Sequence, residues 1–508
     1  MSARTAVFSP WQTACAWADS LAVSCTGAAV WHERRAHRLA ELLEHAAKHS
    51  RVYRERIQAA GGRADAWTTL QRMQPVRKRE LMHRFDEWVT DPALRLPALR
   101  AFVRDRDRRG DAFLDRYVVW ESSGSSGEPA LFVQDVRALA AADALEATRG
   151  PIALPGAGLP SSLPELWSAA AWTPQRIALV AALDGHFASV VAFERQRRLN
   201  PWLGARGRSF SFLQPIAQLV AQLNDFAPTV LATYPSMAWV LSEQQRAGRL
   251  RIEPRALWTG GETLTPALRR ALSDRFHAPL HDSYGASECF FIANECRCGR
   301  LHLNADWVIL EPVDERGRSV PPGQAGATTL LTNLANHVQP IIRYDLGDQV
   351  RFVTAACACG SHLPVIEVQG RADDVLTLRD HSGHDVHLAP LALTTVLEDE
   401  GGVFDFQLRQ RGPQALELEM FDVDAAAHAE GACRALRSFL REQGLASTRV
   451  QCHCDTTPAA RGRSGKRQRV ICQAHAGEHA VATKAVSARV APRARRAKPA
   501  ARAARATA

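Results

Sequence analysis

The stretch Val119-Trp120-Glu121-Ser122-Ser123-Gly124-Ser125-Ser126-Gly127-Glu128-Pro129 places six consecutive Ser and Gly residues between two apolar runs. These runs, Tyr117 to Trp120 and Ala130 to Val133, predict two strands joined by a turn of small residues. Such a turn leaves backbone N–H groups free, and with hydroxyls beside them it can surround an anion such as phosphate. Gly and Ser clusters also form ordinary turns, so the loop alone supports an anion site and a plain hairpin equally.

Length and composition indicate a large globular protein. With 508 residues, 46% of them hydrophobic, the chain can bury a large core and is expected to form two or three domains. Polar residues interrupt the apolar stretch Met1 to Cys25, so we expect no signal peptide, no transmembrane helix and no membrane partner. Eleven cysteines at uneven spacing favour reduced thiols or a metal over a disulfide framework, which predicts a cytoplasmic protein.

The net charge of +10 is concentrated at the C-terminus. Residues 475–508 carry eight Lys or Arg side chains against Glu478, a balance of +7, so the rest of the chain carries only +3. The segment 474–508 is rich in Ala, Arg, Lys and Pro and has no apolar stripe, which predicts a disordered tail. Weak contact with nucleic acid through this tail is the only nucleic-acid role that the charge supports.

Strand and helix patterns alternate through the middle of the chain. Apolar residues at helical spacing, or short apolar runs that end in turn residues, define each element. The predicted helices span 32–60, 135–149 and 237–247, and the predicted strands cover 177–183, 229–232, 256–258 and a run that starts at Leu280. This alternation predicts an α/β architecture.

Several predicted strands end in turns that carry Gly or polar residues. These turns are Tyr234-Pro235-Ser236, Gly260-Gly261-Glu262 and Tyr284-Gly285-Ala286-Ser287-Glu288. In α/β sheets, ligands bind where strands end in such turns, so we expect one crevice shared with the Gly/Ser loop, although each turn alone fits an ordinary connection. Two later segments, Arg343 to Asp348 and Gly370 to Asp374, hold carboxylates suited to ribose hydroxyls and arginines suited to phosphate, or they form surface ion pairs.

In this order and spacing, these segments and Gly465-Lys466 resemble the adenylate-forming superfamily, most closely its phenylacetate–CoA ligase-like branch. The resemblance runs from about Tyr53 to Val470. It implies a large multi-sheet α/β N-terminal domain, residues 1–370, and a small, mobile α+β C-terminal domain, residues 371–473. It also implies that ATP and Mg²⁺ activate a carboxylic acid, aromatic or related and small, to an acyl-adenylate with release of pyrophosphate. The acyl group would then pass to the thiol of coenzyme A.

The resemblance implies a role for each marker residue. Ser122, Ser123, Gly124, Ser125, Ser126 and Gly127 would hold the ATP phosphates; Gly261, Glu262, Asp282 and Tyr284 would border the adenine; Asp348 and Arg371 would hold the ribose. Glu288 would bind Mg²⁺, Lys466 would stabilise the adenylation transition state, and Asp373 would be the hinge. Tyr234, Trp258 and Ala286 would line the acid pocket. Glu128 stands where many relatives carry Lys, an unfavourable charge beside a triphosphate.

Two matched cysteine pairs, Cys296-Arg297-Cys298-Gly299 and Cys357-Ala358-Cys359-Gly360, predict a structural zinc site with four thiolates. One residue between the cysteines, where zinc knuckles usually have two, leaves unliganded thiols as the alternative. Cys452-His453-Cys454 has no matching pair and is interpreted as incidental. Cys289 is interpreted as a packing residue, with a reactive thiol near the site as the alternative.

Other functions stay open at this stage. The acyl group could pass to the phosphopantetheine of an acyl carrier protein instead of coenzyme A. A non-catalytic, zinc-stapled binding protein is a third hypothesis, although such a protein would be expected to lose some of Glu288, Asp348 and Lys466. The sequence identifies neither the acid nor the oligomeric state, and a homodimer is compatible with it.

Overall fold

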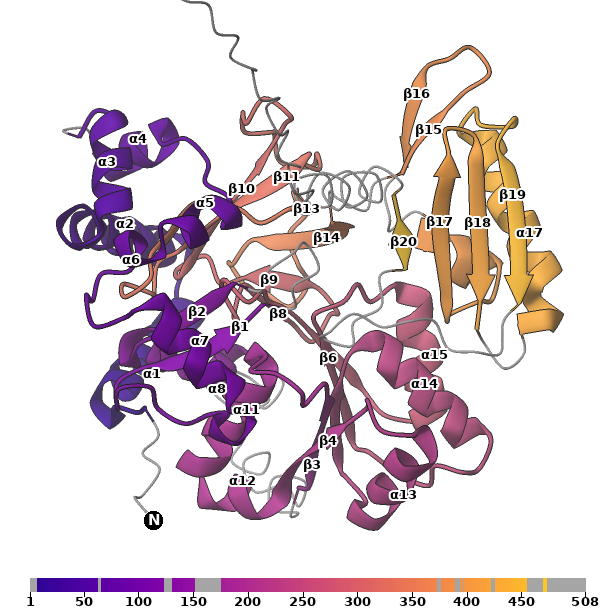
Figure 1. Ribbon diagram of the computed structural model, residues 1–508, viewed down its shortest axis with the longest axis horizontal. Coiled ribbons are helices and arrows are strands. Elements are labelled where there is room, and N and C mark those ends of the chain that lie inside the picture. Colours follow the sequence, from indigo (N-terminus) through magenta and orange to yellow (C-terminus); the bar gives the residue numbers. More distant parts are fainter. Residues whose placement is uncertain are drawn as a thin grey trace, which may run out of the picture.

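The computed structural model describes residues 7–62, 65–122, 130–150, 175–371, 376–388, 393–394, 396–421, 425–454 and 469–472. Figure 1 shows a large body of helices and sheets and a smaller one, at the right of the view, built from the C-terminal strands. No helix within the described residues has the length and apolar character needed to cross a membrane.

Helices make up most of the N-terminal part. They are α1 (Pro10–Cys25), α2 (Ala28–His49), α3 (Arg51–Ala59), α4 (Ala66–Arg72), α5 (Lys78–His83), α6 (Phe85–Trp88), α7 (Leu96–Arg104), the 3₁₀ turn η1 (Arg106–Arg108) and α8 (Val136–Arg149). The single helix predicted over 32–60 is two helices. Ser50 has extended backbone angles there, and its hydroxyl accepts a hydrogen bond from the Tyr53 N–H, so it caps α3.

The central sheet has the strand order β13-β14-β9-β8-β7-β6-β5-β3-β4. Its strands are β3 (Ile177–Ala181), β4 (Gly207–Ser211), β5 (Val230–Thr233), β6 (Ala256–Gly260), β7 (Leu280–Tyr284), β8 (Ala293–Glu295), β9 (Leu301–Leu303), β13 (Asp348–Val353) and β14 (Val365–Arg371). Strands β3 to β7 pair in parallel, and the neighbours from β8 onward pair antiparallel. The predicted strands at 177–183, 229–232, 256–258 and 280 are therefore confirmed.

Helices cover both flanks of the parallel strands (Figure 1). These are α11 (Ala188–Leu199), α12 (Pro201–Arg206), α13 (Ile216–Phe226), α14 (Pro235–Arg246) and α15 (Pro266–Phe276). Leu219, Leu241 and Leu272, one from each of α13, α14 and α15, are fully buried in one core with Leu231 of β5 and Leu257 of β6. Burial of these side chains holds the strand ends at fixed positions along one edge of the sheet.

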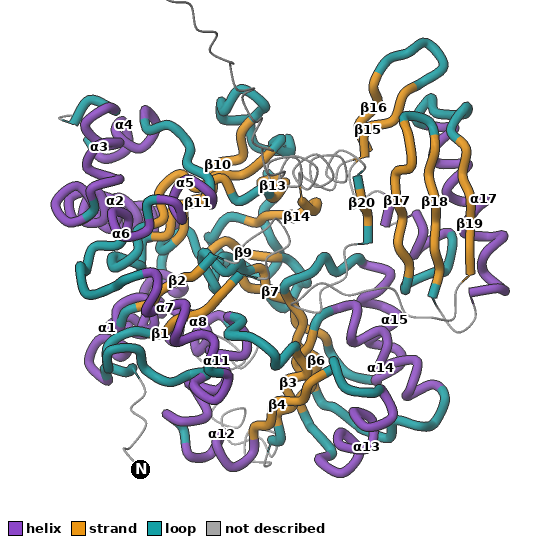
Figure 2. Tube along the Cα trace, in the orientation of Figure 1, coloured by secondary structure: helices purple, strands orange, loops and turns teal. Residues whose placement is uncertain are grey.

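Two further sheets complete the large body. The Gly/Ser stretch lies between β1 (Val118–Glu121) and β2 (Leu131–Gln134), which pair antiparallel as predicted. Strands β10 (Val308–Val313), β11 (Thr328–Asn333) and β12 (Ile341–Asp345) form an antiparallel sheet in that order. The tube in Figure 2 shows these strands between the N-terminal helices and the central sheet.

The C-terminal strands have a core of their own. The hairpin β15 (Leu376–Arg379) and β16 (Asp385–Leu388) precedes the π-helical turn η3 (Val396–Glu400) and a sheet in the order β19-β18-β17-β20. That sheet contains β17 (Phe406–Gly412), β18 (Ala415–Met420), β19 (Arg449–Cys454) and β20 (Val470–Ile471), with α17 (Ala425–Glu442) packed on it. The expected α/β fold is confirmed. The boundary at 370/371 and the limits of the predicted tail stay predictions, because 372–375 and 473–508 lie outside the described residues.

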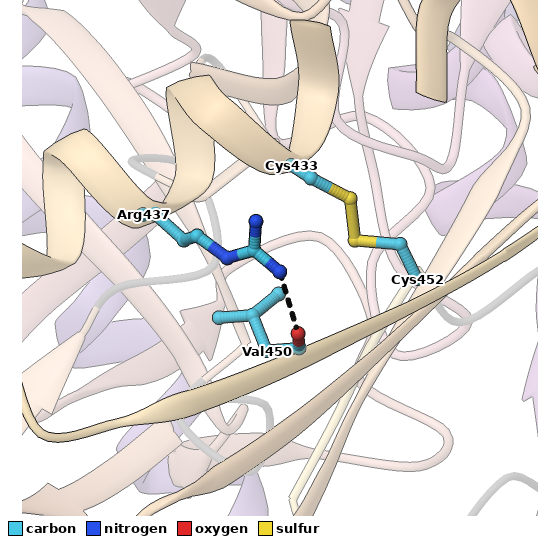
Figure 3. The surroundings of a disulfide bond; sticks show 4 residues. All are labelled: Cys433, Arg437, Val450 and Cys452. Atoms are coloured by element: carbon cyan, nitrogen blue, oxygen red, sulfur yellow. Dashed lines mark hydrogen bonds between the residues drawn. A yellow bond between two sulfur atoms is a disulfide. The ribbon is translucent and has the colours of Figure 1, made fainter. Parts of the chain in front are cut away.

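A disulfide between Cys433 and Cys452 joins α17 to β19, with Cα atoms 6.6 Å apart (Figure 3). Beside it, Arg437 donates a hydrogen bond of 3.1 Å to the carbonyl of Val450. The interpretation of Cys452 as incidental is therefore wrong. Its partner Cys433 lies on a helix and not in another Cys-x-Cys pair, so the spacing of cysteines along the sequence does not predict this disulfide.

Candidate active site

The Gly/Ser loop is closed at its neck by Ser122. The Ser122 N–H donates to the Ala130 carbonyl at 2.8 Å, and the Ala130 N–H donates to Ser122 Oγ at 2.9 Å. Ser122 is buried, and the bond from the Ala130 N–H defines the position of its hydroxyl oxygen. The rest of the loop, namely Ser123, Gly124, Ser125, Ser126, Gly127 and Glu128, lies outside the described residues. Their phosphate-binding role stays a prediction.

Glu262 links the ends of β5 and β6. Its carboxylate accepts from Ser236 twice, from the N–H at 3.0 Å and from Oγ at 3.1 Å. Ser236 lies in the first turn of α14, where free N–H groups and the helix dipole favour a negative charge. Gly261 has a φ of 75°, and a Cβ on Gly260 would lie 2.8 Å from Ser283 Oγ of β7. The Gly-Gly turn is therefore required by backbone geometry.

Asp282 lies on β7 opposite Thr259 of β6, whose hydroxyl donates to its carboxyl group at 2.7 Å. The Asp282 N–H donates to Glu295 at 2.5 Å, and Glu295 pairs with Arg269 at 2.7 Å. Burial raises the pKa of Asp282 to about 7, the bond from Thr259 opposes that rise, and the nearby charge of Glu295 adds to it. Asp282 therefore changes its protonation state near neutral pH.

Two hydrogen bonds join the turn after β7 to the strands β12 and β13. Tyr284 donates its hydroxyl to Asp348 Oδ2 at 2.6 Å, and Tyr344 donates its hydroxyl to Glu288 Oε1 at 2.6 Å. The predicted adenine residue Tyr284 and the predicted ribose residue Asp348 are thus in direct contact. Glu288 is half-buried and held in place by Tyr344, so the site offers an oriented carboxylate of the type that Mg²⁺ prefers.

The Gly/Ser hairpin is connected to the same turn. The Trp120 indole N–H donates to the Ser287 carbonyl at 2.7 Å, and the Glu121 N–H donates to the His186 carbonyl at 2.8 Å. His186 follows β3 and receives a second link, since its own N–H donates to the Glu121 side chain at 3.1 Å. The neck of the loop therefore lies at the carboxyl ends of the parallel strands, where ligands bind in α/β sheets, and the shared crevice stays a prediction.

The predicted substrate-pocket residues have different environments. Tyr234 is buried at the start of α14 and packs edge-on against Phe212 at 6.0 Å, and burial raises the pKa of its hydroxyl to about 12. Trp258 lies on β6, and its indole N–H has no partner within the part of the chain that the structure describes. Ala286 is half-buried in the turn after β7. Two open hollows, one at α17 and β19 and one along α13, contain none of these residues, so the acid pocket stays a prediction.

The remaining predicted residues are described in part or not at all. Arg371 is described by its backbone alone, which pairs with Asp348 across β13 and β14. Asp373 and Lys466 lie outside the described residues. Cys289 is buried in the core and burial raises the pKa of its thiol to about 12, which agrees with a packing role.

Sequence reasoning missed the roles of Tyr344 and Glu295, although Tyr344 lies within a motif that it singled out. The suggestion that Arg343 pairs with phosphate is wrong for this structure. Arg343 is buried, pairs with Glu311 at 3.2 Å, and donates to the carbonyls of Gln71 and Met73. Its φ of 48° turns the chain so that the side chain reaches the N-terminal helices.

The cysteine pairs come together with a histidine. Among the described residues, the side chains of Cys296, His302, Cys357 and Cys359 place one donor atom each within 4.8 Å of one another. Cys298, the predicted fourth ligand, is exposed and is not in this group. The group that the structure brings together has three thiols and one imidazole where four thiolates were expected, because the pairing of β14 with β9 brings His302 beside the Cys357 loop. Metal binding by these side chains stays a prediction.

Residues 204–330, which run from α12 to β11 and include β5, β6 and β7, match the family model described as AMP-binding enzyme. No curated protein matched the chain. Among solved structures, the chain is similar to 2-hydroxyisobutyryl-CoA ligase in its postadenylation state with R3-HIB-AMP, with 19% identity, 91% of this chain and 94% of that chain covered, and a TM-score of 0.63.

The same ligase in its open conformation with 2-HIB-AMP and CoA gives a TM-score of 0.54, 20% identity and coverage of 88% and 93%. In its thioesterification state it gives 0.52, with 21% identity and coverage of 90% and 94%. At these identities the likeness concerns the fold. Residues 204–330 thus match the AMP-binding enzyme model, and the chain shares its α/β fold with 2-hydroxyisobutyryl-CoA ligase.

Proposed function

We propose that the protein is an AMP-forming acid–thiol ligase of the phenylacetate–CoA ligase-like branch, which converts a carboxylic acid and ATP to an acyl-adenylate and then to a coenzyme A thioester. The observation that carries the proposal is the pair of hydrogen bonds Tyr284–Asp348 and Tyr344–Glu288. They bring the turn after β7 and the strand segment 343–348 into one site at the carboxyl edge of the parallel strands.

This arrangement supports binding of an adenosine nucleotide. Asp348 is oriented by Tyr284, and an oriented carboxylate can accept both hydroxyls of a ribose. Asp282 lies on β7, and the Gly260-Gly261 turn ends the neighbouring strand β6, so both would border the adenine at the carboxyl edge of these strands. The ribose and base would therefore lie along the edge formed by β6, β7 and β13.

Charge repulsion is the main barrier when a carboxylate attacks the α-phosphate. Glu288 is the residue that would hold Mg²⁺, which supplies positive charge at the phosphates when bound. Ser122 and the loop it closes would present N–H groups and hydroxyls to the β- and γ-phosphates, and Lys466 would add a positive charge in the adenylation step. The similar 2-hydroxyisobutyryl-CoA ligase was solved in complex with R3-HIB-AMP, which supports an adenylate intermediate here.

Coenzyme A is the acceptor that we favour, because the similar ligase was solved with 2-HIB-AMP and CoA in its thioesterification state. Glu398 of the small body accepts a hydrogen bond from Thr265 of the large one, and we assign this contact to the placement of the small body for adenylation.

ATP–pyrophosphate exchange over a panel of aromatic and short branched carboxylic acids tests the proposal. Exchange that depends on one acid, with a thioester formed on addition of coenzyme A, is the expected result. Lys466→Ala should suppress exchange at least 100-fold, roughly the loss of a charge-stabilising group in a transition state, and spare thioester formation from preformed acyl-adenylate. Exchange without any coenzyme A thioester, but with loading of a phosphopantetheine carrier, would identify the alternative acceptor. Absence of exchange with every acid would refute the adenylation.

A further inference from the structure

We propose that Cys296, His302, Cys357 and Cys359 bind one structural zinc ion, which ties the β8–β9 turn to the loop between β13 and β14. This inference does not rest on the proposed function. It rests on the geometry of four side chains from two segments that are far apart in the sequence.

The distances fit a tetrahedral centre. With metal–sulfur bonds of about 2.3 Å and a metal–nitrogen bond of about 2.0 Å, tetrahedral angles place two sulfurs about 3.8 Å apart and a sulfur and a nitrogen about 3.5 Å apart. The sulfurs of Cys296 and Cys357 are 3.7 Å apart, and Cys359 Sγ lies 3.3 Å from His302 Nε2. Thiol and imidazole donors of this kind, with no position left for water, are typical of structural zinc.

The histidine is oriented for metal binding. His302 is buried, and its Nδ1 lies 2.9 Å from the carbonyl of Leu363, to which a protonated Nδ1 donates. That bond selects the tautomer whose Nε2 carries a lone pair, and Nε2 is the atom that faces the thiols. A hydrogen bond from the second ring nitrogen to a carbonyl is the usual support of a metal-binding histidine.

The two cysteine turns support the sulfurs in the same way. The Cys298 N–H donates to Cys296 Sγ at 3.4 Å, and the Ser361 N–H donates to Cys359 Sγ at 3.4 Å. Each turn ends in a glycine with positive φ, Gly299 at 71° and Gly360 at 83°. Backbone N–H groups aimed at sulfur stabilise a thiolate, which is the form that binds metal.

Cys298 is the competing fourth ligand. Its thiol lies beside that of Cys357, but the residue is exposed, and its backbone N–H donates a hydrogen bond to Cys296 Sγ. His302 is buried and faces Cys359. We therefore assign the fourth position to His302 and a backbone role to Cys298.

The position of the cluster in the sheet gives it a stabilising role. β9, which carries His302, pairs with β14 at Val365, and Glu295 of β8 immediately precedes Cys296. Glu295 accepts the N–H of Asp282 on β7. A metal at this cluster would therefore hold β8, β9 and β14 together. These strands lie beside β7 in the sheet, and the metal would not contact the proposed nucleotide site.

Metal content of the purified full-length chain tests the assignment. We expect one zinc per chain, and zinc X-ray absorption on the unmodified protein should show three sulfur neighbours and one nitrogen. Zinc bound by four sulfurs would overturn the assignment of His302. A chain that takes up neither zinc nor added Co²⁺ under reducing conditions would overturn the site.

Matched variants separate the two candidate ligand sets. Cys359→Ser and His302→Ala should each lose metal and unfold at a lower temperature, whereas Cys298→Ser should keep one zinc and its unfolding temperature. The reverse pattern, with metal lost in Cys298→Ser and kept in His302→Ala, would refute the proposal. If Cys359→Ser fails to fold, X-ray absorption on the unmodified chain still distinguishes a site with one nitrogen ligand from a site with four sulfurs. Zinc content is independent of ATP–pyrophosphate exchange, so either proposal can fail alone.

Discussion

The hydroxyl of Tyr284 donates a hydrogen bond of 2.6 Å to Asp348, across strands β7 and β13 that are separated by β8, β9 and β14 in the sheet. This bond holds a carboxylate at the position proposed for the ribose. It joins two motifs whose bonded residues lie 64 positions apart in the sequence.

Tyr284→Phe should reduce kcat/KM for ATP about tenfold, because a hydrogen bond to a charged group contributes about 1.5 kcal/mol or more. Steady-state ATP–pyrophosphate exchange measures the effect. Tyr117→Phe is the matched control, since Tyr117 also donates its hydroxyl to a carboxylate, that of Asp91, at 2.5 Å. An equal loss in both variants would show that the effect of Tyr284 is general destabilisation.

Glu288→Gln should raise the Mg²⁺ concentration needed for half-maximal exchange by at least tenfold. The amide still accepts the Tyr344 hydrogen bond, so the variant removes the charge and keeps the local structure. Tyr344→Phe, which keeps the charge and loses the bond, should give a smaller shift. An unchanged Mg²⁺ requirement in Glu288→Gln would contradict the proposed metal role.

Asp282→Asn should change how stability depends on pH. The folded-state pKa of Asp282 is raised to about 7, above its unfolded value, so the folded protein binds the extra proton between about pH 4 and pH 7. The contribution of Asp282 to stability is therefore present at low pH and is lost as pH rises toward 7. Because the pKa differs between the folded and unfolded states, the unfolding free energy falls by a few kcal/mol over this range, about 4 at most.

Denaturant unfolding of both proteins across that range isolates the contribution. The difference in unfolding free energy, variant minus unmodified protein, should increase with pH and level off above about pH 7. The Asn side chain retains an acceptor for Thr259, so local packing is kept. A flat difference would show that Asp282 titrates near its ordinary pKa.

Glu398→Gln should impair the first half-reaction more than the second. The Glu398 carboxylate accepts from Thr265 of the large body and pairs with Arg469 of its own, and the residue is buried. Loss of this charge should weaken the observed placement of the small body and reduce exchange several-fold, while thioester formation from preformed acyl-adenylate is spared. Arg379→Gln, which breaks an exposed ion pair with Asp385, is the control and should change neither rate.

Much of the fold and part of the candidate site could be predicted from the sequence. The β1–β2 hairpin, the parallel strands and helices α8 and α14 follow from apolar periodicity and turn residues, which act over a few neighbouring positions. Tyr284, Glu288 and Asp348 were predicted as site residues because they stand in motifs at strand ends, and these assignments stay predictions. Tyr344 was missed as a partner, since its contact with Glu288 depends on how β12 lies against the turn after β7.

Local sequence by itself therefore determined the strands, the helices, the Gly/Ser turn and the order of motifs that predicts an adenylate site. Tertiary structure alone decided which side chains meet: His302 with Cys296, Cys357 and Cys359, and Cys433 with Cys452. The physical reason is that strand register and helix packing set these contacts. The pairing of Val365 with His302 is a long-range match between two strands, and no spacing along the chain encodes it.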